Sequence, residues 1–157
     1  MCARWSILML SVLLIIPGCS HRSPSPEPHS PKPLPPAVKK VQQGPNQEIE
    51  YGYYENGRIE YEIPYMSGKI NGIARHWSET GVLLSEAEYV NGQIHGVWIQ
   101  FNVDGTLLSK TEYWYGEKHG ADRWFHPNGL LASETFYNYG RQRGETKRWD
   151  ANGEPIP

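Results

Sequence analysis

The chain has 157 residues and a formal net charge of −2, which is enough for one modest domain. Residues 48–157 hold 10 Lys and Arg against 16 Asp and Glu, and this net charge of −6 argues against a nucleic-acid binder, which normally has a basic face. Both cysteines, Cys2 and Cys19, lie in the first 19 residues, so residues 48–157 have neither a disulfide nor a cysteine-ligated metal site.

Residues 1–19 predict an export signal. Arg4 precedes an apolar run from Ile7 to Ile16, which is shorter than the roughly 20 residues that span a bilayer and fits the apolar part of a signal peptide. The residues Ile-Pro-Gly before Cys19 resemble the bacterial lipobox. That resemblance implies cleavage before Cys19 and its acylation. The alternatives are a signal peptide cut nearby, with an incidental cysteine, and an uncleaved membrane anchor.

Residues 20–47 predict a Pro/Ser-rich disordered linker. They hold eight prolines and four serines, a composition that buries little apolar surface and favours extended polyproline II. At about 3.1 Å per residue, such a segment reaches on the order of 80 Å. We therefore interpret it as a spacer between a membrane and the following domain, with a proline-recognition ligand as the alternative.

A strict 24-residue period runs from about residue 48 to the C-terminus. Three sets of glycines keep this step: Gly57, Gly81, Gly105, Gly129 and Gly153; Gly68, Gly92, Gly116 and Gly140; Gly72, Gly96, Gly120 and Gly144. A fixed period of this length indicates an array of small units, each of which buries its neighbour. We number positions within a unit from the third set, which is position 0 and is occupied by Glu48 in the first unit.

Each unit predicts one β-hairpin. An aromatic residue stands at position 5, Leu or Ile at position 11 and Tyr at position 17, with small residues at positions 13 and 15. Alternation with period two between positions 11 and 17 indicates a strand. Tips such as Pro127-Asn128-Gly129 favour a three-residue loop made of a type I turn that ends in a left-handed glycine. This loop places the aromatic residue of position 5 opposite the Leu or Ile of position 11.

The hairpins together predict an all-β fold, a repeat array of antiparallel hairpins that forms a single-layer twisted meander of about nine strands over residues 48–157. We expect an inner face with one aromatic, one Leu and one Tyr per repeat, and glycines that serve turns. Charges near Glu48 and the prolines at Pro155 and Pro157 block further strand pairing at the two ends.

These residues resemble a known family. The segment from Tyr89 to Trp98, YVNGQIHGVW, is echoed from Tyr113 to Gly120 and from Tyr137 to Gly144, and is similar to the MORN repeat in its bacterial variant of about 24 residues. The resemblance implies a hairpin per repeat, no catalytic residues, and binding to partners or membrane lipids. Bacterial members often carry an antitoxin label, which fits poorly with an exported protein because most toxins act in the cytosol.

Several residue types that carry chemistry recur in register, and this recurrence favours packing. A nucleophilic serine needs a unique base beside it, and a histidine metal site needs further ligands. We therefore predict no catalytic site, no metal site and no cofactor, and expect the glutamates to point outward. The residues considered are Ser85, Ser109, Ser133, His95, His119, Glu86, Glu88, Glu112 and Glu134.

Five aromatic residues lie off the expected inward-facing positions and are candidates for binding: Trp98, Trp114, Tyr115, Trp124 and Tyr139. Exposed aromatic rings stack on sugars or prolines, or become buried at a partner interface. The alternative is that they cover the second face of a thin sheet. A separate basic cluster of Arg141, Arg143, Lys147 and Arg148 is interpreted as a solvated terminal turn.

The sequence thus predicts a lipid-anchored, non-catalytic module of a bacterial envelope that binds a protein partner or an envelope polymer. Ser20 follows the lipidated cysteine where an acidic residue would favour inner-membrane retention, so the outer membrane is expected in a Gram-negative host. An antitoxin-like protein and a purely structural scaffold are the alternatives, and an enzyme is disfavoured.

Overall fold

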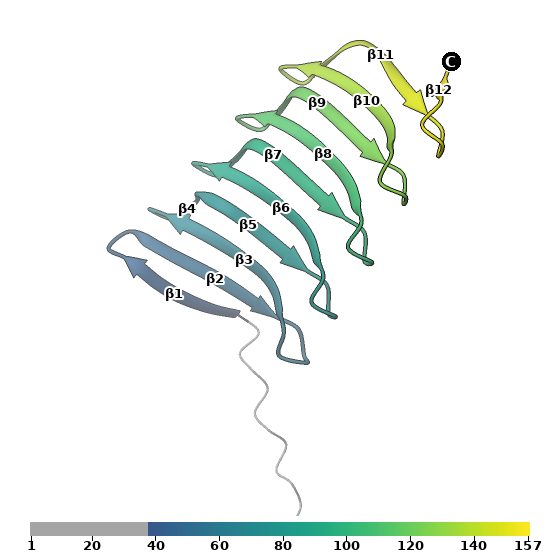
Figure 1. The fold of residues 1–157 in the computed structure, drawn as a ribbon. Coiled ribbons are helices and arrows are strands. Elements are labelled where there is room, and N and C mark those ends of the chain that lie inside the picture. The colour runs from purple at the N-terminus through teal and green to yellow at the C-terminus, as the bar shows by residue number, and fades with distance from the viewer. Residues whose placement is uncertain (1–37) are drawn as a thin grey trace, which may run out of the picture. The chain divides into compact units, whose positions relative to one another are not determined.

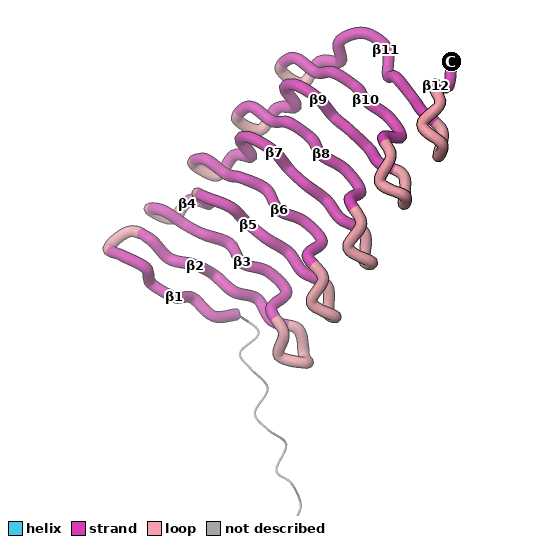
Figure 2. Tube along the Cα trace, viewed as in Figure 1, coloured by secondary structure: helices cyan, strands magenta, loops and turns pink. Residues whose placement is uncertain are grey.

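The computed structural model describes residues 38–157, and their regular structure is entirely β-strand (Figures 1 and 2). The strands form one antiparallel 12-stranded sheet whose order follows the chain, with the short β4 paired only to β3. Their bounds are β1 (Val38–Gly44), β2 (Gln47–Tyr53), β3 (Ile59–Met66), β4 (Lys69–Ile70), β5 (Gly72–Trp77), β6 (Leu83–Val90), β7 (Gln93–Phe101), β8 (Leu107–Trp114), β9 (Glu117–Phe125), β10 (Leu131–Asn138), β11 (Arg141–Trp149) and β12 (Pro155–Ile156). Among residues 38–157, no helix is long and apolar enough to cross a membrane.

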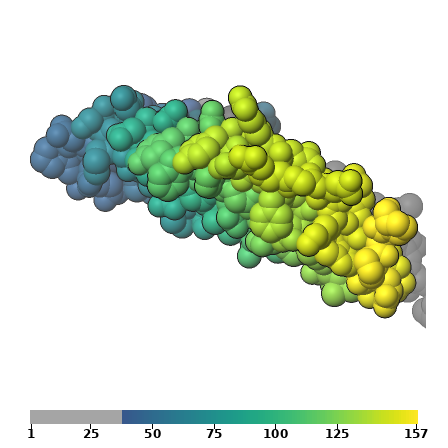
Figure 3. All heavy atoms as spheres, turned by 90° about the horizontal axis from the view of Figure 1, so that it is seen from above, coloured from purple at the N-terminus to yellow at the C-terminus, as the bar shows by residue number. Residues whose placement is uncertain are grey.

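The array is an antiparallel hairpin meander, as the sequence predicts, but it begins earlier. Val38–Gly44 forms β1 and pairs with β2, although the proline-rich composition placed these residues in the linker. Val38 and Val41 supply the β-branched residues of an edge strand, and Pro45 falls in the turn that follows. The space-filling view shows the repeats following one another in chain order (Figure 3).

One edge of the sheet carries the predicted three-residue loops. In the first loop the Gly57 amide donates to the Tyr54 carbonyl at 2.9 Å, which closes the type I turn, and Gly57 has φ of 80°. The same bond recurs in the four later loops. The predicted opposition of positions 5 and 11 is confirmed by the pairs Tyr53–Ile59, Trp77–Leu83, Phe101–Leu107 and Phe125–Leu131.

The opposite edge carries two-residue turns in which both residues have positive φ. This pattern is that of the type I′ turn, whose twist matches the strands it joins. The turns are Ser67-Gly68, Asn91-Gly92, Tyr115-Gly116 and Tyr139-Gly140. The Gly92, Gly116 and Gly140 amides each donate to a carbonyl of the preceding repeat at 2.7–2.9 Å, so this edge also links neighbouring hairpins.

The second strand of each hairpin contains a β-bulge, and this bulge decides which side chains share a face of the sheet. Phe101 pairs with Leu107, but the next residue, Gln100, pairs with Ser109, so Leu108 is the extra residue. The bulge therefore brings even positions 2 and 4 onto the face that carries positions 13, 15 and 17. We call this face the serine face and the other the charged face.

The third set of glycines corrects one expectation, because these glycines lie inside or at the start of strands and not in turns. Gly96 has φ of 97° and sits where three residues of β7 oppose one residue of β6. A Cβ on Gly96 would lie 2.5 Å from Oε2 of Glu88, and Gly120 is similarly close to Glu112. The positive φ therefore favours glycine here, and a Cβ would in addition displace the end of a glutamate side chain.

The sheet is a single layer and has no conventional apolar core in residues 38–157. Its most buried side chains are small or polar and lie midway along the strands: Ala87, Ser109, Thr111, Ala121, Asp122 and Thr135. Large side chains flank this middle zone and remain partly exposed. The fold is consequently held by the hydrogen-bonded ladder and by side-chain rows that run across the strands.

Candidate functional site: the serine face and the turn-edge aromatic cluster

A single row of side chains crosses the middle of the serine face. We call it the central row, and it consists of Ile63, Ala74, Ala87, Trp98, Thr111, Asp122, Thr135 and Thr146, which occupy repeat positions 15 and 2 alternately. Cross-strand pairs connect its neighbours from Ala74 to Thr135. The row is apolar as far as Trp98 and polar from Thr111 onward.

The apolar half of the serine face, on β3 to β7, contains a shallow hollow of about 240 Å³. Ile63, Ala74, Ala87 and Ile94 form its apolar lining, and Trp98 closes one side. The hollow exists because two adjacent positions of the central row hold the small Ala74 and Ala87, between the larger Ile63 and Trp98.

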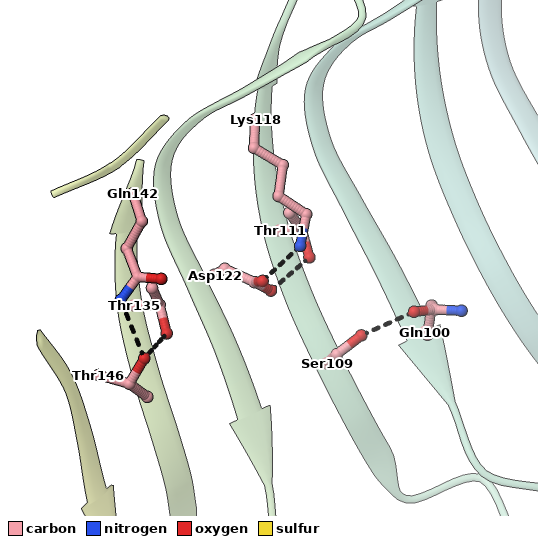
Figure 4. A network of polar contacts seen from close by, with 8 residues as sticks. All are labelled: Gln100, Ser109, Thr111, Lys118, Asp122, Thr135, Gln142 and Thr146. Carbon is pink, nitrogen blue, oxygen red and sulfur yellow. Dashed lines mark hydrogen bonds and ion pairs between the residues drawn. The ribbon is translucent and has the colours of Figure 1, made fainter. Parts of the chain in front are cut away.

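The polar half, on β8 to β11, carries a network of hydrogen bonds (Figure 4). Asp122 is only 6% exposed and accepts from the Thr111 hydroxyl at 2.8 Å and from Lys118 Nζ at 2.5 Å. Thr135 and Thr146 share a hydrogen bond of 2.8 Å one strand further along. The lysine and the threonine hydroxyl compensate the cost of burying the Asp122 carboxylate, which would be destabilising if it had no partner.

Two groups at this network, Lys118 and Tyr113, have raised pKa values in the folded state. Partial burial by itself lowers the pKa of Lys118, but the hydrogen bond and the charge of Asp122 outweigh it, so the net pKa of Lys118 is raised. Burial raises the pKa of the neighbouring Tyr113, against the opposing charge of Lys118. The Lys118 ammonium also lies 5.1 Å from the centre of the Tyr137 ring, a distance typical of a cation–π contact.

The charged face carries cross-strand ion pairs in both halves. Arg75 contacts Glu86 at 2.8 Å and Glu62 at 3.8 Å, and Arg123 contacts Glu134 at 2.8 Å and Glu112 at 3.6 Å. Glutamates at position 14 therefore point away from the serine face, as the sequence predicts for Glu86 and Glu134. The two arginine side chains are about a third exposed, so each ion pair contributes little to stability.

Aromatic rings gather at the edge with the two-residue turns. We call this the turn-edge aromatic cluster, and it consists of His95, Trp114, Tyr115, His119 and Tyr139. The His95 ring lies 4.4 Å from Tyr115 and 4.6 Å from Trp114, and the His119 ring lies 4.6 Å from Tyr139. Trp114 joins the two groups at 6.4 Å from His119. The spacings are those of favourable aromatic pairs.

The backbone beneath two of these rings is in an unusual conformation. Tyr115 and Tyr139 have φ of 44° and 47° at the first position of their type I′ turns. Asn91 occupies the same position one repeat earlier. Asn and Gly adopt this left-handed region readily, whereas a tyrosine there is strained by roughly 1–2 kcal/mol. The same strained conformation therefore occurs in two successive repeats.

The structure brings together three of the five predicted aromatic candidates. Trp114, Tyr115 and Tyr139 are 45–56% exposed and belong to the turn-edge aromatic cluster. Trp124 is 44% exposed, as predicted, but lies apart from them and pairs with Ser109 and Ser133 on the serine face.

Trp98 corrects the prediction, because it is half-buried in the central row between Ala87 and Thr111. Strict alternation from position 5 would have placed Trp98 and Trp124 on the face opposite the small residues. The bulge removes that alternation, so both lie on the serine face.

The histidines of the cluster play no visible part in a metal site. Within residues 38–157 there is no group of three or more His, Cys, Asp or Glu side chains arranged to hold a metal ion. The His119 Nδ1 atom lies 3.4 Å from the Tyr139 amide, while the buried His95 Nδ1 has no hydrogen-bond partner within the same residues. Their rings instead support the exposed Tyr139, Trp114 and Tyr115.

Sequence reasoning missed the polar network and the place of His95 and His119 in the aromatic cluster. The network was visible only by aligning positions 2 and 22, where Ala74 and Ile70 give way to Asp122 and Lys118 two repeats later. Cys19 lies outside the described residues.

A match to one protein-family model supports the repeat interpretation. The family described as MORN repeat variant matches residues 49–66 and 70–91, which are two adjacent repeats. No curated protein matches the chain. The crystal structure of TarM is similar at 11% identity and a TM-score of 0.41, over 68% of this chain and 21% of that one, so this chain spans about a fifth of that protein's length.

Proposed function

We propose that this repeat protein is a non-catalytic binding module, anchored in a bacterial envelope by a lipid on Cys19, which recognises a protein partner or an envelope polymer. The turn-edge aromatic cluster is its contact surface. The observation that carries the proposal is the presence of exposed tyrosines at Tyr115 and Tyr139, where the backbone favours asparagine or glycine.

Strained residues concentrate where binding or catalysis uses them. Within residues 38–157, the side chains that contact Tyr115 and Tyr139 in these turns include His95, Trp114 and His119, and these contacts leave both tyrosine rings about half exposed. Exposed rings held in fixed orientations lose little conformational entropy when a partner covers them. Tyrosine and tryptophan are also the side chains enriched at binding hot spots.

Anchoring rests on the sequence alone. The apolar run before Cys19 and the lipobox-like residues Ile-Pro-Gly support export and acylation, and the proline-rich linker supports a spacer role. Ser20 favours the outer membrane in a Gram-negative host.

Two alternatives predict different results. A purely structural scaffold needs the sheet but not the exposed rings, and an antitoxin-like protein acts in the cytosol on a soluble partner. Variants that keep the sheet and remove the exposed rings distinguish the scaffold from the proposal. Whether Cys19 is acylated distinguishes the antitoxin-like protein from it.

The binding surface is tested with the double variant Tyr115→Asn/Tyr139→Asn. Asparagine suits the left-handed turn, so we expect the thermal unfolding midpoint to stay the same or rise, while in-cell crosslinking to the partner falls at least tenfold. The matched control is Tyr54→Asn, which changes a tyrosine at the three-residue-loop edge. Unchanged crosslinking by the double variant would leave the scaffold as the better explanation.

The anchor is tested by intact-mass analysis of the protein from its native host beside Cys19→Ala. A mass increase equal to two or three acyl chains with glycerol on Cys19, absent from the variant, is expected. An unmodified cytosolic protein that co-purifies with a cytosolic partner would overturn the localisation and support the antitoxin-like alternative.

A further inference from the structure

The turn-edge aromatic cluster presents the same exposed ring twice, in successive turns of one edge (Figure 1). Tyr115 and Tyr139 have φ of 44° and 47°, and their rings pack on His95 and His119 at 4.4 Å and 4.6 Å, with interplanar angles of 47° and 56°. One repeat of the array therefore carries the first ring onto the second. Because one repeat contains two strands, the two rings are about 9.6 Å apart.

This spacing discriminates between the regular conformations of a polypeptide ligand. Side chains on one face of a β-strand recur about every 6.7 Å. In an α-helix the rise is about 5.4 Å for one turn and about 10.5 Å for the seven residues of two turns. In polyproline II every third residue returns to the same side after about 9.3 Å. Of the three, polyproline II comes closest to the spacing of the rings.

The chemistry of the cluster also suits a proline-rich ligand. Polyproline II has no internal hydrogen bonds, so its carbonyl groups remain free to accept them. The hydroxyls of Tyr115 and Tyr139 and the indole N–H of Trp114 are donors, and they belong to rings that are 45–56% exposed. Proline fixes its own φ, and the turns fix the tyrosines. Little conformational entropy is therefore lost when the two surfaces meet.

The charges beside the two rings have opposite signs. Repeat position 21, two residues after each tyrosine, holds Glu117 beside Tyr115 and Arg141 beside Tyr139, and both side chains are exposed. A ligand that crosses both rings is therefore complementary when it carries a basic residue at its Tyr115 end and an acidic residue at its Tyr139 end.

We propose that the turn-edge aromatic cluster binds a proline-rich segment of a partner protein in the polyproline II conformation. Prolines three residues apart lie on Tyr115 and Tyr139, and one basic and one acidic residue flank them. This inference rests on the proposed function, of which it names the partner class. Preformed polyproline II segments bind aromatic surfaces in this way because little has to become ordered on binding.

The nearest prolines of the chain itself are too close to the sheet to be the ligand within one copy. Pro33, Pro35 and Pro36 lie within five residues of Val38, so they are at most about 18 Å from it. Val38 is in β1, and the sheet order β1-β2-β3-β5-β6-β7-β8 puts the strand before Tyr115 six steps away, about 29 Å. A second copy is a separate source, and the test includes it.

The test uses a capped hexaproline peptide, about 19 Å long, and the full-length chain in detergent. Nitrogen-15 NMR spectra follow the backbone amides and the indole N–H of Trp114. We expect saturable shifts at millimolar peptide, confined to the two turns and the cluster. Tyr115→Asn and Tyr139→Asn should each weaken binding about three- to tenfold, and the double variant should abolish it. The matched control Tyr54→Asn should bind as the wild type does, and a Gly-Ser hexapeptide should not bind.

A gain of binding tests the spacing. Asn91→Tyr together with Asn71→His copies the ring and its histidine one repeat earlier, at the same turn position. This variant should bind capped nonaproline, about 28 Å long, at least about threefold more tightly than the wild type. Its affinity for hexaproline, which spans only two rings, should change by about twofold or less, and this retained binding also shows that the variant is folded.

Peptides with charged ends test the flanking residues. Hexaproline with lysine at one end and glutamate at the other should bind about two- to fivefold more tightly than the same peptide with lysine at both ends, the size of an exposed ion pair. Glu117→Arg should instead prefer the peptide with glutamate at both ends. Equal affinities for all of these peptides would reject the assigned charges.

Several outcomes would overturn the proposal. They are no saturable binding of any proline peptide, equal binding of the Gly-Ser peptide, and unchanged binding by the double variant. If the proline peptides fail but the double variant still loses its in-cell partner, the proposed function stands and this inference falls.

Two further outcomes would identify a different ligand and reject the partner assignment. The same shifts caused by a hexamer of β-1,4-linked N-acetylglucosamine, and not by hexaproline, would make the ligand a polysaccharide. Self-association of the wild-type chain in sedimentation, absent from the double variant, would make the prolines of a second copy the ligand.

Discussion

The two halves of the serine face share one backbone and differ in what holds their side chains together. From Ala74 to Trp98 the central row is apolar, and the neighbouring Ile94 lines a shallow hollow. From Thr111 to Thr146 the row is polar, and Lys118 replaces isoleucine at the same repeat position. The hydrogen-bonded sheet accommodates both the apolar and the polar row because turns and bulges set the strand register. The side chains of the row need only be buried and, where polar, hydrogen-bonded.

The largest effect is expected when only the carboxylate of the polar network is introduced into the apolar half, without its lysine partner. Ala74→Asp places a carboxylate at the position of Asp122, but Ile70 stands where Lys118 would be. An unpaired carboxylate in a half-buried site should destabilise the fold by about 2–4 kcal/mol in chemical denaturation. Adding Ile70→Lys should recover part of this loss. A double variant no more stable than Ala74→Asp would mean that the two halves are not interchangeable.

Removing the carboxylate from the polar half is the reciprocal change. Asp122→Ala leaves the Lys118 ammonium and the Thr111 hydroxyl without their shared acceptor, and we expect a loss of about 1–3 kcal/mol. Glu117→Ala, an exposed carboxylate on the same strand, is the control and should change stability by less than about 0.5 kcal/mol. Equal unfolding midpoints for the two variants would show that the network contributes nothing.

Alkaline pH should weaken the polar half gradually. The pKa values of Lys118 and Tyr113 are both raised in the folded state, so their contributions are present below about pH 10 and are lost as pH rises through the folded pKa values. The free energy of unfolding, measured against pH, should therefore fall above pH 10. The fall should be shallower in Lys118→Met because the contribution of Lys118 is gone. It should not vanish, since Tyr113 and the tyrosines of the apolar half still titrate. Identical slopes would contradict the role of Lys118.

The smallest effect is expected on the charged face, where the halves are alike. Arg75 and Arg123 make matching ion pairs, and each is about a third exposed. Arg75→Gln and Arg123→Gln should each cost about 1 kcal/mol or less, by similar amounts, and less in high salt. A clear difference between the two variants would show that the two halves of the sheet also differ in stability on the charged face.

Much of the fold could be predicted because the repeat states the same local chemistry several times. The glycine at position 9, preceded by Asn, Asp or Thr, specifies the type I turn with its left-handed end, and the facing of Trp77 with Leu83 follows from that loop. The exposure of Trp114, Tyr115 and Tyr139 also followed from their positions.

The faces of Trp98 and Trp124 could not be predicted in the same way. They depend on an extra residue at position 12, such as Leu108, and a one-residue shift exchanges the two faces of a strand. Composition likewise could not locate β1, because Val38–Gly44 becomes a strand only by pairing with β2.

The sequence by itself determined the period, the hairpins, the two turn types' glycines and the absence of cysteine from the repeats, since each depends on residues near one another in the chain. The tertiary structure alone decided which distant side chains meet. Asp122 with Thr111 and His95 with Tyr115 meet because strands stack beside one another, and bulges set that alignment through the whole sheet.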